Sequence, residues 1–357
     1  MIGSYKLSLI GFSHLREEGG VCQDASGVKT LQNGWVAAVI ADGLGSAKHS
    51  DIGAKIAVST VLQFVEDHAP AFWHDESLVS LLRIAYHAAL KKIKERADAD
   101  DCNIRDFDTT LTTVLYNGTN TVFGHVGDGG IIALNPFGEF SILTTAQKGE
   151  EFNMVTPLRS GPDQWMFGVA SDTAVALLLL TDGLYDVACP WLLSKQEQKI
   201  NIGFVRPFMD RNILSVNTED DFILVEKEIE EFLKYETKHV TDDKTILGII
   251  NTDILPEIKS DEYYTEPDWQ QLSDFHSEKL YGRKTEEFSE PEEEPEQAPG
   301  PEEPESVQEP EIMEVPRIDV APSRMNSINN FLTKHLFKKK RHDRGDDHWK
   351  QTESKDK

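Results

Sequence analysis

Three aspartates adjoin runs of apolar residues long enough to form buried strands, and a fourth lies between the first two predicted strands of the chain, residues 5–12 and 34–41. Asp42 and Asp182 each end an apolar run, and Asp242 stands just before a third. The fourth is Asp24. A carboxylate at the end of a buried strand is partly desolvated, which is costly unless a cation neutralises it. Several converging carboxylates would form the all-oxygen site that Mg²⁺ and Mn²⁺ prefer.

A glycine follows both Asp42 and Asp182. Asp-Gly is also a common turn pair, so each case alone has a plain structural explanation. The pair occurs twice after apolar runs, however, and Asp242-Asp243 precedes a third run. This repetition favours a metal site over simple turns.

Six short motifs occur in a fixed order between about residues 8 and 251. They are Gln23-Asp24, Asp42-Gly43-Leu44-Gly45, Asp108-Thr109-Thr110-Leu111, Val126-Gly127-Asp128, Thr181-Asp182-Gly183-Leu184 and Asp242-Asp243-Lys244-Thr245. This order resembles the PP2C-type (PPM) metal-dependent serine/threonine protein phosphatases in their bacterial form. The resemblance implies an α+β fold, a four-layer αββα sandwich of two antiparallel sheets flanked by helix pairs.

The resemblance also implies the chemistry of the site. Asp42 would bridge two Mn²⁺ or Mg²⁺ ions, and the Gly43 carbonyl would bind one of them. Asp182 and Asp242 would hold the other ion. The implied reaction is hydrolysis of phosphoserine and phosphothreonine in proteins by a water molecule that the metals activate. Such a mechanism needs no cysteine or serine nucleophile.

Two further carboxylates complete the implied ligand set. Asp24 would lie beside the metal pair as a ligand, and Asp128 resembles the carboxylate that holds a third ion in bacterial members. Thr109 and Thr110 resemble a buried pair with a structural role. His125 precedes the Asp128 motif, and we interpret it as a packed or exposed strand residue.

The sequence departs from the family pattern around the first motif. Many members have Glu where this chain has Gln23, so one metal position loses a carboxylate. The family's phosphate-binding arginine is replaced by Gly19. His14 is our candidate for the phosphate contact, with Arg16 as the alternative. Animal members have a histidine where this chain has Leu44.

Composition excludes several other classes of protein. The chain has 36 basic and 62 acidic residues and a net charge of −26, which opposes binding to nucleic acid. Its three cysteines form no CxxC pair, so neither a zinc site nor a disulfide scaffold is indicated. We find no signal peptide and no transmembrane segment, and we expect a cytoplasmic protein.

Hydrophobic periodicity predicts alternating hairpins and helix pairs, which is typical of an α+β fold. Residues 145–174 show no clear period and are predicted to be a long irregular segment. The predicted strands are 5–12, 34–41, 110–116, 120–126, 130–134, 139–144, 174–181 and 245–251. The predicted helices are 52–67, 75–96, 190–200 and 219–235.

We expect three segments along the chain. Residues 1–256 form the phosphatase-like domain, which we expect to be monomeric. Residues 257–322 are rich in Pro and Glu, which predicts a disordered acidic linker. Residues 323–357 are basic, and an apolar helical face in them would bind a cognate serine/threonine kinase or another protein, or alternatively cover the substrate groove of the domain; we favour the partner.

Other functions remain open from the sequence alone. Gln23 and Gly19 allow a pseudophosphatase that keeps the fold as a binding module. A scaffold acting mainly through the C-terminal tail is another possibility. A phosphatase with an aspartyl-phosphate intermediate would need a DxDx[TV] motif after a strand, and the sequence has none.

Overall fold

The computed structural model describes residues 1–15, 20–148, 155–193, 199–237 and 240–281. Residues up to Glu266 form one compact unit. The described part of a second unit contains helix α8 (Trp269–Tyr281). The predicted basic helix in residues 323–357 lies outside the described part of the chain.

The first unit is built on two five-stranded sheets in which every strand pair is antiparallel. The first sheet has the order β1 (Ile2–Leu9), β10 (Lys244–Asn251), β9 (Ala176–Leu180), β6 (Gly130–Leu134), β7 (Phe140–Ile142). The second has the order β2 (Ala25–Thr30), β3 (Val36–Ala41), β4 (Leu111–Tyr116), β5 (Thr121–Val126), β8 (Met166–Val169).

Continuous apolar runs form the central strands because both faces of each sheet are covered. In β9, Leu177 and Leu179 belong to the core between the two sheets. Leu178 and Leu180 alternate with them and pack on the helix-facing side. The sheets therefore have no solvent-facing side along this strand, and a strict apolar–polar alternation is absent.

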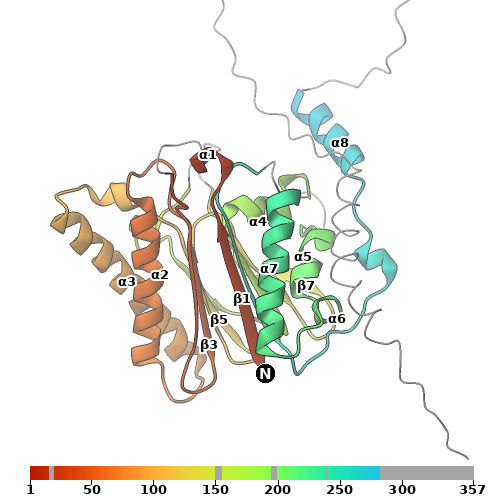
Figure 1. Cartoon of the computed structure of the whole chain (residues 1–357), viewed down its shortest axis with the longest axis horizontal. Coiled ribbons are helices and arrows are strands. Elements are labelled where there is room, and N and C mark those ends of the chain that lie inside the picture. Colours follow the sequence, from red (N-terminus) through yellow and green to blue (C-terminus); the bar gives the residue numbers. More distant parts are fainter. Residues whose placement is uncertain (16–19, 149–154, 194–198, 238–239, 282–357) are drawn as a thin grey trace, which may run out of the picture. The chain divides into compact units, whose positions relative to one another are not determined.

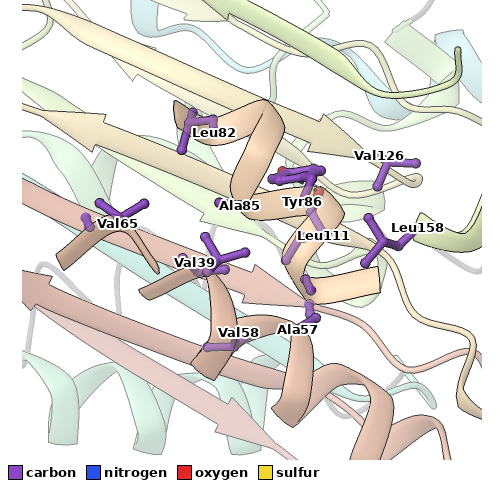
Figure 2. Packing of buried hydrophobic residues seen from close by; sticks show 14 of the residues in the cluster. Val39, Ala57, Val58, Val65, Leu82, Ala85, Tyr86, Leu111, Val126 and Leu158 are labelled. Atoms are coloured by element: carbon purple, nitrogen blue, oxygen red, sulfur yellow. Dashed lines mark hydrogen bonds between the residues drawn. The ribbon is translucent and has the colours of Figure 1, made fainter. Parts of the chain in front are cut away.

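Helices cover the outer faces of both sheets (Figure 1). On the second sheet, α2 (Ser50–His68) and α3 (Asp75–Ala99) pack through Ala57, Val58 and Tyr86 against Val39 and Leu111, as Figure 2 shows. The first sheet carries α4 (Asp182–Ala188), α5 (Ile202–Met209) and α7 (Glu219–Glu236). The other short helices are α1 (Phe12–Leu15), α6 (Arg211–Leu214), η1 (Ile104–Phe107), η2 (Leu158–Ser160), η3 (Trp191–Leu193) and η4 (Asp261–Tyr264). These layers confirm the predicted αββα sandwich.

Several elements differ from the sequence-based prediction. Strand β2 was missed because ASGVKT has little apolar character, and β8 lies inside the segment predicted to be irregular. The helix predicted over 190–200 is wrong where the structure describes it, since η3 is its only helical part. Instead, the chain forms α4 before it and α5 after it. In the described part of the chain, no helix is both long and apolar enough to cross a membrane.

Residues 257–266, predicted to begin the linker, pack on the first unit. The Tyr263 hydroxyl accepts a hydrogen bond from the backbone N–H of Phe140 (2.9 Å). The guanidinium carbon of Arg206 lies 3.5 Å from the ring centroid of Tyr264. Both tyrosines also contact the apolar core under the first sheet. This segment therefore belongs to the folded domain.

A fragment ending at residue 256 is expected to be less stable than one ending at residue 266. The shorter fragment loses one partly buried hydrogen bond, one cation–π contact and apolar packing. Together these losses should lower its free energy of unfolding by about 2 kcal/mol or more. Urea unfolding of the two fragments would measure the difference. Equal unfolding midpoints would show that residues 257–266 contribute nothing to the fold.

Candidate metal centre

Three aspartates from different parts of the chain converge at one end of the sandwich. Asp42 follows β3, Asp128 lies in the turn between β5 and β6, and Asp182 begins α4. Carboxylate oxygens of these three side chains lie within 4.8 Å of one another. The structure therefore brings together three of the predicted metal ligands.

Strand register explains this convergence. In the first sheet, Gly130 pairs with Leu180, so Asp128 and Asp182 extend past the same end of the β6–β9 pair. In the second sheet, Ala25 pairs with Ala41, which places Asp24 opposite Asp42. The ends of the two pairs are joined directly, because the Thr181 hydroxyl donates to Oδ2 of Asp24 (2.9 Å).

The buried threonine pair fixes the backbone of Asp42. The N–H of Thr110 and the hydroxyl of Thr109 both donate to the Asp42 carbonyl, each at 2.8 Å. The Thr110 hydroxyl accepts from the Asp42 N–H at 2.9 Å. A side chain on Gly43 would meet the backbone of Gln23 and Ser50 at 2.7–2.8 Å. These contacts confirm a structural role for the pair and explain the glycine.

Burial and mutual repulsion make the centre hard to ionise. Burial raises the pKa of Asp42 well above its usual value, and the charge of Asp182 raises it further. Burial likewise raises the pKa of Asp24 to about 7 and that of Asp182 to about 8. A divalent cation would remove both penalties.

The metal-free protein is expected to lose stability as pH rises from about 4 to about 8. Unfolded aspartates release their protons near pH 4, whereas native Asp24 and Asp182 hold theirs to about pH 7 and 8. The native state then binds more protons than the unfolded state, so the free energy of unfolding falls with rising pH. Urea unfolding in EDTA would measure this slope, which should be shallower in Asp182→Asn. A stability that rises across this range would contradict the electrostatic picture.

Three buried oxygens at the centre also fit a cation. Oε1 of Gln23, Oδ1 of Asp24 and Oδ1 of Asp128 have no hydrogen-bond partner among the described residues. Buried oxygens without partners are costly in a folded protein. All three are hard oxygen ligands, so Mg²⁺ or Mn²⁺ would satisfy them. The donor set therefore matches the predicted cofactors.

The exchange Gln23→Glu is expected to tighten Mn²⁺ binding and to destabilise the metal-free protein. It adds a charge where the carboxylates already repel one another, and charge count raises affinity at oxygen-ligand sites. Calorimetric Mn²⁺ titration and melting in EDTA would measure the two effects. Gln32→Glu, in the exposed turn before β3, adds the same charge as a control. Identical titration curves for Gln23→Glu and wild type would place Gln23 outside the ligand set.

The two neighbouring aspartates before β10 have different environments. Asp242 is exposed, and its charge raises the pKa of Asp42, Asp128 and Asp182, so it faces the centre. Asp243 is only 2% exposed, and it accepts N–H bonds from Gly11 and Gln23. Neither Asp24 nor Asp242 belongs to the group of three within 4.8 Å.

His14 lies at the edge of the centre. Its Nδ1 is 3.1 Å from Oδ1 of Asp243, the residue next to Asp242. The side chain is 12% exposed. Its part in binding phosphate stays a prediction, and the alternative Arg16 lies outside the described residues.

Two ion pairs near the centre were missed by sequence reasoning. Lys148 binds both carboxylate oxygens of Asp186 (2.7 and 2.8 Å), and its charge partly offsets the burial that raises the pKa of Asp128. Arg159 makes a bidentate ion pair with Asp108, in which each of the two hydrogen bonds is 2.7 Å long. These partners lie 38 and 51 residues apart, and no local pattern in the sequence relates them.

Fold and site together define a four-layer α+β sandwich with a carboxylate centre at one end of its two sheets. The family model of protein phosphatase 2C matches residues 10–234, more than half of the chain. The chain therefore belongs to the protein phosphatase 2C family, as its motif order predicted.

Individual proteins of known name or structure share only a small fraction of identical residues with this chain. A serine/threonine-protein phosphatase 3 of Escherichia coli (strain K12) is 23% identical over 248 residues, which cover 67% of this chain and 94% of that protein. A bacterial serine phosphatase of known structure has a TM-score of 0.50 at 16% identity, covering 72% of this chain and all of that one. The serine/threonine phosphatase of S. agalactiae also has a TM-score of 0.50, at 18% identity, covering 70% of this chain and 99% of that one. These structures support the fold.

Proposed function

We propose that this chain hydrolyses phosphoserine and phosphothreonine in proteins with Mn²⁺ or Mg²⁺ as its cofactor. The observation that carries the proposal is the group formed by Asp42, Asp128 and Asp182, whose oxygens lie within 4.8 Å of one another in a protein phosphatase 2C fold. The name of the E. coli relative supports the serine/threonine specificity.

The ligands would be shared among the ions as the resemblance to the family implies. Asp42 would contact two ions, with the Gly43 carbonyl on one, and Asp182 and Asp242 on the other. Asp24 would lie beside the pair, and Asp128 would hold a third ion. When bound, such ions lower the pKa of water and offset charge on the phosphoryl oxygens.

The protein's own residues position and shield this chemistry. Without cations, the carboxyl groups of the centre supply no positive charge to offset that of a phosphate group, so activity should depend strictly on metal. The threonine pair fixes the backbone from which the Asp42 carboxylate projects, which would limit its reorganisation during the reaction. His14, held beside Asp243, would donate to a phosphate oxygen in place of the family's arginine.

The wider setting of the enzyme follows the same proposal. Its substrates would be phosphoproteins in the cytoplasm, and nucleic acid would be excluded by the acidic charge of the chain. Residues 323–357 would bring a cognate serine/threonine kinase or another partner to the domain. Deleting these residues should weaken binding of the partner and leave turnover of a small phosphate ester unchanged.

Phosphate release from phosphothreonine and phosphoserine peptides by the full-length chain tests the proposal. Release is expected with Mn²⁺ and is expected to stop with EDTA, and a phosphotyrosine peptide should be a poor substrate. Binding of Mn²⁺ and phosphopeptide without any release of phosphate would instead support the pseudophosphatase alternative.

A further inference from the structure

Gly127, the residue before Asp128, is held through both its carbonyl and its N–H. The carbonyl oxygen lies 3.0 Å from Nε2 of His125 and accepts the backbone N–H of Gln147 at 2.7 Å. The Gly127 N–H donates to Oε1 of Gln147 at 3.1 Å. With φ at +126°, this position requires glycine, and a Cβ would lie 2.5 Å from that of Thr110. These contacts restrain the backbone of the turn that carries Asp128.

The contacts of His125 determine which of its ring nitrogens carries the proton. A carbonyl oxygen can only accept, so Nε2 is the protonated nitrogen facing Gly127. The side chain is completely buried, and burial lowers its pKa to about 4, so the ring is neutral. Nδ1 then accepts the hydroxyl of Thr112, its cross-strand neighbour, at 2.9 Å. Both ring nitrogens are thus used.

Gln147 completes the support from a second segment of the chain. Besides its two bonds to Gly127, its Nε2 donates to the carbonyl of Gln164 at 2.7 Å. The turn before Asp128 is therefore tied to β5 through His125 and to the segments following β7 through Gln147.

The side chain of Asp128 depends on this backbone support. Its Oδ1 is buried and has no hydrogen-bond partner among the described residues. Burial raises its pKa, and the charge of Lys148 partly offsets this rise. Among the described residues no hydrogen bond holds this oxygen, so the support that the structure shows for Asp128 comes through its main chain.

We propose that His125 is a positioning residue, whose Nε2–H holds the Gly127 carbonyl and thereby sets Asp128 for binding a cation. This inference rests on the proposed function, because it assumes that the centre binds divalent cations. His125 itself touches neither cation nor substrate. Its action resembles that of the outer hydrogen bonds that orient metal ligands and whose loss weakens metal affinity about tenfold or more.

Two substitutions separate this role from simple packing. A glutamine at position 125 places its amide near Nε2 and can still donate to Gly127. An asparagine places its amide near Nδ1 and keeps only the contact with Thr112. In the full-length protein, His125→Gln should keep near-normal Mn²⁺ affinity, whereas His125→Asn should bind the ion assigned to Asp128 about tenfold less tightly.

Electron paramagnetic resonance measures free Mn²⁺, so the number of bound ions follows from the loss of this signal when protein is added. The melting temperature in EDTA would show whether each variant is folded. Asp128→Asn serves as the reference for loss of the same ion. Gln147→Leu removes the second support at a partly exposed position, so it should fold and lose that ion too.

If wild type bound Mn²⁺ as expected and His125→Asn bound it with the same affinity as wild type, the role of His125 would be overturned and the proposed function would stand. Equal losses in both His125 variants, matched by equal losses of melting temperature, would also overturn it, since packing would then explain the effect. Failure of wild type to bind Mn²⁺ would overturn the proposed function, and the inference with it.

Discussion

Asp42→Asn is expected to reduce Mn²⁺-dependent phosphate release to below about 1% of wild type. Asp42 is the carboxylate on which the others converge, since the charges of Asp24, Asp128, Asp182 and Asp242 all raise its pKa. An amide in its place cannot supply the charge that a cation needs. The same exchange removes buried repulsion, so the metal-free protein should melt at an equal or higher temperature.

This opposite effect on activity and stability separates loss of the site from misfolding. Asp172→Asn provides a matched control, because Asp172 is exposed and precedes β9 at the end remote from Asp182. The control should keep wild-type turnover and Mn²⁺ affinity. If Asp42→Asn kept more than a few per cent of turnover at saturating Mn²⁺, the assignment of the centre would be wrong.

The substitutions Asp242→Asn and Asp243→Asn should have contrasting effects on metal binding and stability, although the two residues are adjacent. Asp243→Asn should lower the free energy of unfolding by about 2 kcal/mol or more, because each of its two buried oxygens accepts an N–H bond (2.5 and 2.6 Å) and the exchange turns one of them into an NH₂ donor. Asp242→Asn should leave stability unchanged, since the side chain is exposed. It should instead weaken Mn²⁺ binding and reduce turnover to a few per cent.

Urea unfolding in EDTA and Mn²⁺ titration on both variants would make the comparison. The variants carry the same chemical change one residue apart, so each is the control for the other. The reverse outcome, a destabilised Asp242→Asn with a stable Asp243→Asn, would show that the roles of the two residues are exchanged.

The sequence was sufficient where one strong local signal determined the structure. The run ending at Asp182 is apolar at every position because helices and a second sheet cover its two faces, so its strand was predictable. Strand β2 has few apolar residues, and only pairing with β3 makes it a strand. The helix that begins at Asp182 was not predicted, and the helical pattern assigned to residues 190–200 falls between α4 and α5.

The candidate site shows the same division. Asp42 and Asp182 were predicted from strand ends, and Asp128 from resemblance alone. Asp243 and His125 could not be distinguished from surface or packing residues, because only the folded structure shows which groups their side chains contact. Asp243 binds Gly11, 232 residues away, and His125 acts through a neighbouring peptide that the sequence does not reveal.

Anomalous scattering from crystals of the full-length protein soaked in Mn²⁺ tests the central claim most directly. The claim predicts strong peaks about 2.2 Å from carboxylate oxygens of both Asp42 and Asp182, with the Asp42 peak absent in Asp42→Asn crystals. Mn²⁺ peaks elsewhere in the molecule, with none in contact with Asp42, would contradict the proposed metal centre.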